Sequence, residues 1–400
     1  MSGALNNIYN NVSYALYLHS IEMSRLQEQT TTGSRINRPS DDPSCSYRVI
    51  TLNSQEKSLE NYINNLSETT DTLELSSTVI QDIQSAIVET KVLLTQVMGG
   101  IYNDENRERL AERINDTLEQ VVSLANTKNM GQYLFGGSNT TSAPYLTERT
   151  NGEITGVTYQ GSFENREIEV ASGIKSSAFQ VGYDIFGSDN RSDPVFLGDT
   201  GAAAGSGTSS VKGDTWLTVT DDGGGSYDLS IDDGATSVNV AAEVLAGADI
   251  ANIAVTNASG EVLYVDATNI SSTGVEMVSV PGTYNIFDTL ISARNLLRNE
   301  RELSDAQLRE LHNNSLTVLD EVNGLMVQAE VSVGSKIGFL DNLKESLKKL
   351  KFDVEDESTL LQEADIAQIA IDLSRREVLY QMSLSIAGKL MSLSLLDFLE

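Results

Sequence analysis

Hydrophobic positions recur at helical spacing along the first quarter of the chain. Steps of three and four residues from Leu59 to Val97 meet an apolar side chain at nine of twelve positions, over more than five heptads. This spacing predicts a long amphipathic helix of the coiled-coil type. The stripe consists of Leu59, Tyr62, Leu66, Thr69, Leu73, Ser76, Ile80, Ile83, Ile87, Thr90, Leu94 and Val97. Gly99 and Gly100 are expected to end the helix.

Two shorter helical patterns lie on either side of this stripe. The one before Pro39 predicts an amphipathic N-terminal helix, and the other predicts a helix after Gly100. Gly33 is expected to end the first helix, because glycine readily adopts positive φ. Asp42 followed by Pro43 fits an N-cap with proline at the first helical position. The two patterns consist of Leu5, Ile8, Val12, Ala15 and Leu26, and of Leu110, Ile114, Thr117, Val121 and Leu124.

The C-terminal part repeats the helical pattern. One stretch is followed, after a change of phase near Gly334, by a second stretch and then by the tail, residues 378–400. The two stretches carry Leu308, Leu311, Val318, Val322, Leu325 and Ala329, and then Leu340, Leu343, Leu347 and Leu350. Because strands of one coiled coil need matched seams, the helical N- and C-terminal parts are expected to pair.

The tail is apolar around most of its circumference. One stripe carries Leu379, Met382, Ile386, Leu390, Leu393 and Leu396, and its neighbour carries Tyr380, Leu384, Ala387, Met391, Leu395 and Phe398. A helix of this kind should be buried. Lys389 and four serines interrupt the run, so it lacks the roughly 18 apolar residues of a membrane span. We therefore expect the tail to pack against protein, either its own chain or a partner.

The middle of the chain has a different character. Residues 131–283 contain 22 of the 30 glycines and three of the five prolines. Alternating patterns in 157–170 and 215–231 predict strands joined by glycine-rich turns. The stretch GAAAGSG at 201–207 is interpreted as a linker between two small β units. The predicted fold class is thus α+β and multidomain, with long terminal helices and a β-rich middle inserted between them.

Charge excludes several classes of partner. The net charge of −30 argues against nucleic acid and against anionic lipid surfaces. The excess is concentrated in 184–283, where 15 acidic residues face two basic ones. The single cysteine, Cys45, excludes an internal disulfide framework. The first residues lack the basic and apolar regions of a cleavable secretory signal.

No catalytic constellation is found. The two histidines, His19 and His312, lie inside helical patterns and are interpreted as packing or surface residues. Cys45 has no neighbouring base, and no Lys-Ser or Lys-Thr follows the glycines of 201–207 to hold a phosphate. Two interpretations remain open for four aspartates beside a hairpin, a calcium site or ordinary turn chemistry, although EF-hand spacing is lacking. These are Asp221, Asp222, Asp232 and Asp233.

Three stretches resemble a known family. TGSRINRPSDDP with the helix LENYINNLSETTDTLELSSTVIQDIQ, and the C-terminal EADIAQIAIDLSRREVLYQMSLSIAGKLMSLSLLDFLE, are similar to the two ends of bacterial flagellins. Within that superfamily GQYLFGGSNTTSAPY, TYQGSFENREIEVASG and VGSKIGFLDNL resemble the hook-associated protein 3 branch. The resemblance covers roughly 1–190 and 284–400, whereas 191–283 resemble nothing recognised.

The resemblance implies four parts. Residues 1–40 and 365–400 would form a terminal helical pair of an inner tube, disordered in the monomer. Residues 41–135 and 284–364 would form a helical rod, 136–190 a β-rich domain, and 191–283 an acidic outer insert.

The resemblance also implies a function. It suggests a non-enzymatic ring at the junction between hook-associated protein 1 and the flagellin filament, without cofactor or metal. The expected partners are those two proteins, further copies of the chain and an export chaperone, with type III export to the outside of the cell and without a cleaved signal peptide. The predicted subunit interface comprises Leu5, Ile8, Val12, Leu379, Met382, Leu384, Ile386, Leu390, Leu393 and Leu396. A flagellin filament subunit and a secreted adhesin-like surface protein are the alternatives.

Overall fold

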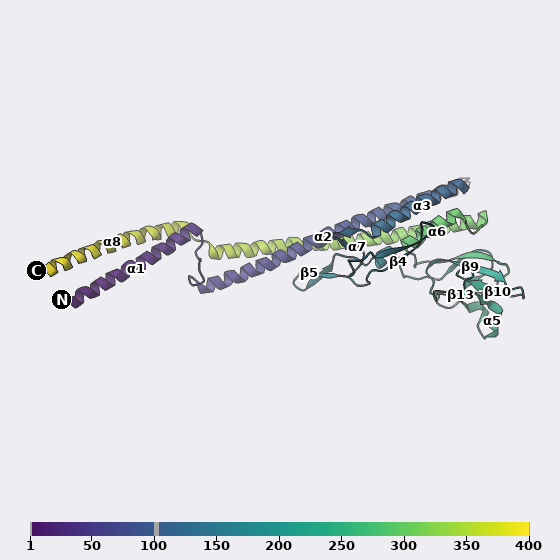
Figure 1. Cartoon of the computed structure of the whole chain (residues 1–400), viewed down its shortest axis with the longest axis horizontal. Coiled ribbons are helices and arrows are strands. Elements are labelled where there is room, and N and C mark those ends of the chain that lie inside the picture. The colour runs from purple at the N-terminus through teal and green to yellow at the C-terminus, as the bar shows by residue number, and fades with distance from the viewer. Residues whose placement is uncertain (1, 100–103, 400) are drawn as a thin grey trace. The chain divides into compact units, whose positions relative to one another are not determined.

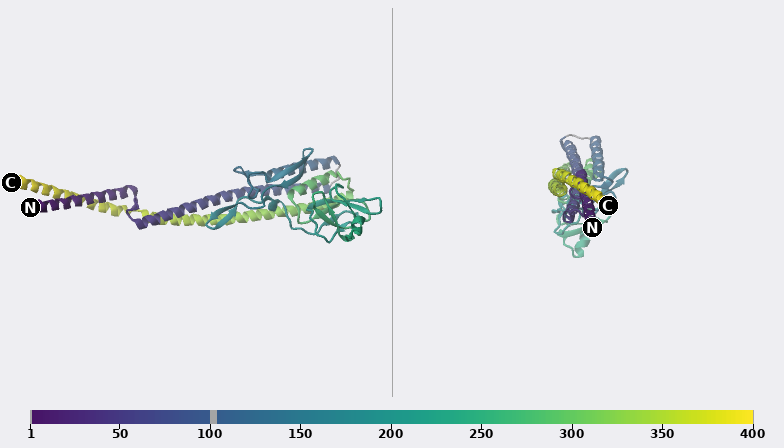
Figure 2. Two further views of the ribbon diagram at one scale, coloured as in Figure 1. Left: turned by 60° about the horizontal axis from the view of Figure 1, so that its bottom comes forward. Right: turned by 90° about the vertical axis from the view of Figure 1, so that its left-hand side faces the viewer.

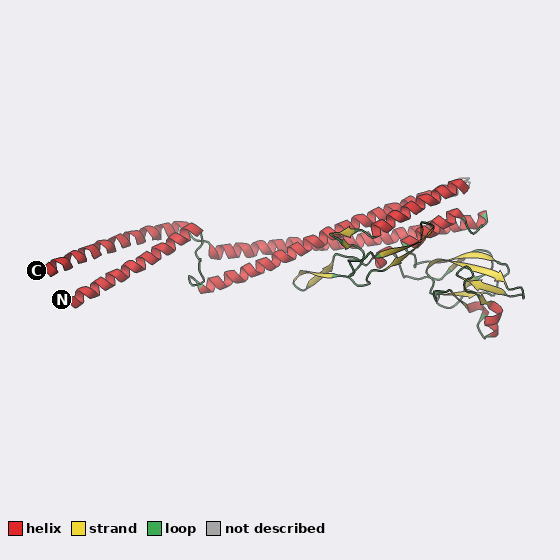
Figure 3. Ribbon diagram, in the orientation of Figure 1, coloured by secondary structure: helices red, strands yellow, loops and turns green. Residues whose placement is uncertain are grey.

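Long helices form both ends of the chain and β-structure occupies its middle (Figures 1 and 3). The computed structural model describes residues 2–99 and 104–399, without the side chains of 2–6, 8, 9, 98, 99, 104 and 390–399. The predicted α+β class is confirmed. The helices are α1 (Ser2–Thr32), α2 (Pro43–Gly99), α3 (Asp104–Ala125), α4 (Gly182–Phe186), α5 (Val240–Leu245), α6 (Ile286–Arg298), α7 (Asp305–Gln362) and α8 (Ile366–Leu399), with a 3₁₀ turn at Ile250–Asn252.

The chain divides into two compact units. One contains the residues up to Asn64 and from Leu343, and the other contains Asn65–Asn342. In the first unit α1 lies beside α8, so the predicted pairing of the termini is confirmed (Figure 2). The beginning of α2 and the end of α7 pack together through Leu52, Leu59 and Val354.

The turns after α1 and after α7 are hydrogen-bonded to each other. The amide of Ala364 donates to the carbonyl of Gly33 at 3.0 Å, and the amide of Arg35 donates to the carbonyl of Gln362 at 2.7 Å. Gly33 has φ of 69° and follows the last residue of α1, as predicted. The Asp42 carboxylate accepts a hydrogen bond from the Cys45 amide at 3.0 Å, which confirms the predicted N-cap of α2.

In the second unit α2 and α7 form the centre of a helical rod. Gln81 donates a hydrogen bond to Glu330 on α7 at 2.6 Å, and Lys91 pairs with Asp320. Eleven of the twelve residues in the predicted α2 stripe are buried, and Tyr62 is half-buried. α7 continues without a break through Gly334, although Leu350 of its predicted stripe is exposed. α3 packs against α6.

Three β-hairpins follow α3. They pair β1 (Lys128–Asn129) with β2 (Gln132–Tyr133), β3 (Tyr145–Thr150) with β4 (Glu153–Tyr159), and β5 (Glu167–Ala171) with β6 (Ile174–Ser177). The strands predicted in 157–170 are thus the end of β4 and the start of β5. Arg294 of α6 fixes the second hairpin, because its buried guanidinium donates to the carbonyl of Ile154 at 2.8 Å and to Asn115 of α3 at 2.7 Å.

Residues 191–283 form two facing sheets around a shared core. The five-stranded sheet has the order β11-β10-β9-β14-β7 and the three-stranded sheet has the order β12-β13-β8. The core contains Leu217, Val219, Leu229, Val255 and Leu263. The strands are β7 (Val195–Leu197), β8 (Ala203–Ala204), β9 (Gly213–Asp221), β10 (Tyr227–Ser230), β11 (Val238–Asn239), β12 (Ile253–Thr256), β13 (Val262–Asp266) and β14 (Gly274–Val280).

The prediction of a linker at 201–207 is wrong. Ala203 and Ala204 form β8 and pair with Asp266 and Val265 of β13. The glycines around β8 allow close packing rather than flexibility: a Cβ atom on Gly207 would lie 2.3 Å from the ring of Tyr264. The stretch is therefore an edge strand of the smaller sheet.

The two-sheet module is fixed to the rod. Met277, Leu197 and Trp216 pack against Leu296, Leu303, Leu308 and Leu311 of α6, α7 and the loop between them. Arg301 forms two hydrogen bonds to the carboxylate of Asp233, at 2.7 and 2.9 Å, and its guanidinium lies 4.6 Å from the Trp216 ring centre.

Candidate assembly surface

The terminal pair α1–α8 exposes large apolar side chains along both helices. Of the predicted interface residues on α8, four are described and exposed, and Val12 on α1 is half-buried. The exposed fractions are 38% for Leu379, 58% for Met382, 47% for Leu384 and 51% for Ile386. The side chains of Leu5, Ile8, Leu390, Leu393 and Leu396 lie outside the described residues. Packing of α1 on α8 therefore leaves apolar surface uncovered on each helix.

Further exposed residues on this pair were not predicted from the sequence. On α1 they are Tyr14, Tyr17, Leu18 and Ile21, and on α8 they are Ile366, Ile371 and Val378. Contiguous apolar surface on a soluble chain marks a site of interaction. The width of the apolar face in the sequence could have predicted these exposed residues. A single partner helix covers only one stripe of such a face.

Charged side chains lie between the two helices as well. A cavity of about 380 Å³ between α1 and α8 is lined by Glu22, Leu26, Asp372, Arg375, Arg376 and Leu379. Arg376 of α8 lies 3.4 Å from Nδ1 of His19, so this half-buried histidine contacts the neighbouring helix. The terminal pair thus combines apolar stripes with charges of both signs.

Structural roles account for the other candidate residues. His312 is buried in α7, and burial lowers its pKa, so it remains a neutral packing residue. Sγ of Cys45 lies 3.5 Å from the guanidinium of Arg35. Asp232 accepts hydrogen bonds from the amides of Thr236 at 2.8 Å and Ala258 at 3.0 Å, and the Thr236 bond chiefly lowers its pKa to about 2.

The other three aspartates near the hairpin also have partners. Asp221 and Asp222 accept from the amides of Gly223 at 2.8 Å and Gly224 at 2.7 Å, and Asp233 pairs with Arg301. The hydrogen bonds favour turn chemistry over a calcium site. Across residues 2–99 and 104–399, no group of three or more histidine, cysteine or acidic side chains could hold a metal ion.

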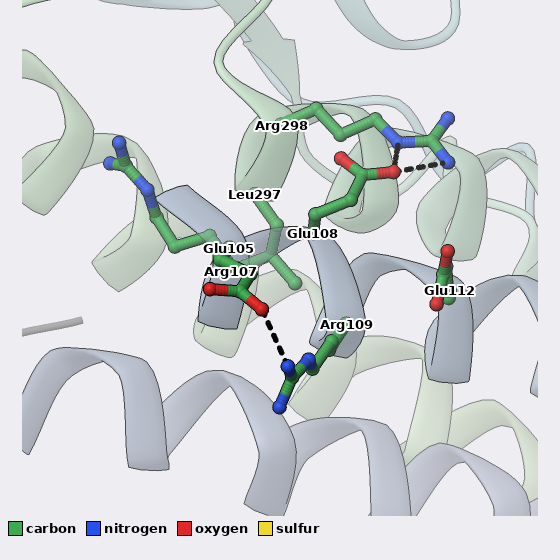
Figure 4. A pocket seen from close by; sticks show the side chains of 7 residues that line it. All are labelled: Glu105, Arg107, Glu108, Arg109, Glu112, Leu297 and Arg298. Carbon is green, nitrogen blue, oxygen red and sulfur yellow. Dashed lines mark hydrogen bonds and ion pairs between the residues drawn. The ribbon is translucent and has the colours of Figure 1, made fainter. Parts of the chain in front are cut away.

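A charged groove of about 540 Å³ lies between α3 and α6 (Figure 4). Arg109 pairs with Glu105 at 2.6 Å, and Arg298 donates to Glu108 at 3.1 Å. Arg298 also forms hydrogen bonds of 2.5 and 2.7 Å with the Glu153 carboxylate, which lower the pKa of Glu153. Leu297 contributes an apolar part of the lining. The pairs of Arg298 join α6 to α3 and to β4, whereas the pair of Arg109 and Glu105 lies within α3, so the groove has a structural role.

Part of the chain is similar to known flagellar proteins. Residues 4–140 match the family model for the bacterial flagellin N-terminal helical region. The flagellar hook-associated protein 3 of Escherichia coli is 29% identical over 32% of this chain and 41% of its own length. Its counterpart in Salmonella typhimurium is 29% identical over 31% of this chain and 39% of its own length. The chain thus matches about two fifths of the length of these curated relatives.

A solved structure supports the fold. The crystal structure of flagellar hook-associated protein 3 from Legionella pneumophila has a TM-score of 0.51 and 19% identity. The likeness covers 78% of this chain and 97% of that one. Both chains thus share the fold of long terminal helices with a β-rich middle. Residues 4–140 thus resemble the flagellin N-terminal region, and about a third of the chain is similar in sequence to hook-associated protein 3.

None of the helices in the described ranges has the length and apolar character that crossing a bilayer requires.

Proposed function

We propose that the protein is a structural subunit of the bacterial flagellum and forms a ring between the hook and the flagellin filament. The observation that carries this proposal is the exposed apolar face of the α1–α8 pair, in a chain related to hook-associated protein 3. A face of this kind is covered when identical subunits pack side by side.

The partners follow from that position. Hook-associated protein 1 would contact the ring on one side and flagellin on the other, and copies of this chain would contact one another. An export chaperone would cover the apolar termini before the protein leaves the cell through the flagellar type III apparatus. The protein would act mechanically and would catalyse no reaction.

Imaging of the tagged protein on purified flagella tests the proposal. We expect one compact signal where hook and filament meet. A signal along the whole filament would overturn the proposal in favour of a filament subunit. A signal on the cell surface away from flagella would instead support an adhesin-like role.

A further inference from the structure

A cavity with aromatic walls lies in the second unit, beside the β3–β4 hairpin, α4 and the start of α6. Its volume is about 150 Å³, and its rings are those of Tyr145, Tyr159, Tyr183, Phe186 and Phe287. The ring centres of Tyr145 and Phe287 lie 4.7 Å apart, and those of Tyr159 and Tyr183 lie 6.1 Å apart. The rings support one another in tilted and edge-to-face arrangements. The walls are therefore held in place by packing.

Polar groups line the same cavity. Lys212 donates to Asp189 at 2.6 Å and to the Tyr183 hydroxyl at 2.7 Å, and that hydroxyl donates to Asp189 at 2.8 Å. Each carboxylate oxygen of Asp189 thus accepts one of these bonds and keeps the capacity for another. Both Asp189 and Lys212 remain about half exposed, at 53% and 48%. A ligand that enters from solvent can reach them.

Size and chemistry together define the ligand. A cavity of about 150 Å³ holds a ring the size of benzene. Five aromatic side chains favour a flat apolar ring over a hydrated sugar, and Asp189 favours a ring that carries a hydroxyl donor. We propose that this cavity is a binding site for a single phenolic ring, and that its occupant is a tyrosine side chain of a second copy of the chain.

The tyrosine that enters the cavity must be exposed on the neighbouring copy. Among the described side chains, exposed tyrosines are Tyr14 and Tyr17 on α1 and Tyr47 near the start of α2. Tyr47 is the most exposed of the three, at 75%, and lies outside the terminal pair. The occupant is thus Tyr47 of a neighbouring copy. This assignment rests on the proposed function, in which copies of the chain form a ring of subunits.

Binding of p-cresol, which reproduces the tyrosine side chain, tests the cavity. Saturation-transfer NMR on the purified full-length protein should detect p-cresol with a Kd on the order of 1 mM. Toluene, which lacks the hydroxyl, should bind more weakly. Asp189→Asn should weaken p-cresol about threefold to tenfold and leave toluene unchanged, because it removes a charged acceptor. Equal binding of both probes, or no binding of either, would overturn the proposed chemistry.

Blocked variants locate the binding. Ser188→Tyr puts a tethered ring among the lining residues and should abolish binding of both probes. Ser172→Tyr, in the exposed turn between β5 and β6, is the matched control and should bind like the wild type. Thermal melts establish that each variant is folded, and Val157→Phe replaces Ser188→Tyr if the latter is not. Binding that survives in a folded blocked variant would contradict the site.

Photo-crosslinking on assembled flagella tests the occupant. Benzoylphenylalanine at position 50, an exposed position one helical turn after Tyr47, should yield an adduct of two copies of this chain, and the blocking substitution Ser188→Tyr should abolish it. An adduct with another protein, or no adduct, would overturn the second copy as occupant while p-cresol binding stands. If the protein does not form a ring of subunits at the hook–filament junction, the tagged wild-type protein will instead be found elsewhere in the imaging experiment.

Discussion

Asp214 is an acidic side chain placed where the two-sheet module meets the rod. Its carboxylate accepts a hydrogen bond of 2.8 Å from the Ser279 hydroxyl, which also contacts Tyr284 and accepts from Asn314 of α7 at 3.0 Å. Desolvation raises the pKa of Asp214 from 3.8 to about 6, since no cation compensates it strongly enough. At neutral pH the folded protein therefore holds an unfavourable charge at this position.

The first prediction concerns the substitution Asp214→Asn. The folded carboxyl group has a pKa near 6 and the unfolded one near 3.8, so the folded state binds the proton more tightly. The stabilising contribution of Asp214 is therefore complete at acid pH and is lost as pH rises through 6. Asparagine can still accept from Ser279, so Asp214→Asn should add about 1–2 kcal/mol to the unfolding free energy at pH 7.5.

Denaturant unfolding at two pH values checks this prediction. The gain should shrink toward zero at pH values near 4, where the wild-type carboxyl group is protonated. A gain of equal size at both pH values would contradict the ionisation argument.

Gly207 gives the second prediction. Gly207→Ala should destabilise the two-sheet module by about 1–3 kcal/mol, because the added methyl group overlaps the Tyr264 ring in a packed site. Gly224→Ala is the matched control, since its methyl group would meet Asp222 at an ordinary contact distance of 3.4 Å. Thermal melts of the two variants measure the difference. Equal melting temperatures would restore the interpretation of 201–207 as a flexible linker.

At the scale of elements, the helices follow directly from local sequence. The α2 stripe predicted burial correctly even at Thr69, Ser76 and Thr90, whose hydroxyls donate to the carbonyls four residues earlier at 2.7–3.0 Å. The hydrogen bonds of a helix lie within one segment of the chain, so the spacing of apolar residues is enough to predict the helix and its buried face. Four exposed apolar residues of α8 lie on the two stripes of its sequence, whereas Ile366, Ile371 and Val378 lie outside them; the four are Leu379, Met382, Leu384 and Ile386.

The β-rich part depends on contacts that sequence spacing does not encode. β14 lies between β9 and β7, about 60 and 80 residues away along the chain, so its partners are set by tertiary packing. The aromatic cavity also combines residues from Tyr145 to Phe287. Glycine-rich composition suggested flexibility at 201–207, whereas the glycines there allow residues 264–270 of the same chain to approach closely.

The third prediction concerns the stability of α1 and α8 in the isolated protein. The pair leaves Met382 and Ile386 more than half exposed, whereas α2 buries Leu66, Leu73 and Ile80 completely. Helices that lack tertiary packing are marginal in water. Hydrogen exchange on the monomer should therefore be fast across 1–40 and 365–400 and slow across 65–97. Slow exchange across both termini would contradict this expectation.

At the scale of the whole chain, the acidic charge is concentrated away from the terminal helices. Residues 184–283 carry 15 acidic and two basic residues, and this segment is fixed to the rod by Trp216, Met277 and Arg301. Charge of one sign favours solubility and opposes association of this part with its copies. Self-association is therefore expected through the helices, where apolar surface is available.

The last prediction separates folding from assembly. Leu384 and Ile386 are about half exposed, so Leu384→Asp or Ile386→Asp should leave the melt of the second unit unchanged. In a ring each aspartate would be buried without a partner, at a cost of several kcal/mol per subunit. Export should survive if its signal lies in the N-terminal segment. Filaments should then fail to attach, and flagellin should appear in the culture supernatant.

Leu245→Asp is the matched control for these tail variants, because Leu245 is 89% exposed on α5 and belongs to the second unit. It should melt and assemble like the wild type. Calorimetry of each purified variant and the partition of flagellin between cells and medium measure the two effects. Normal filaments in the tail variants would refute the assembly surface. A lowered melt would instead place α8 in the internal core, because a charge then disrupts packing that already exists in the monomer.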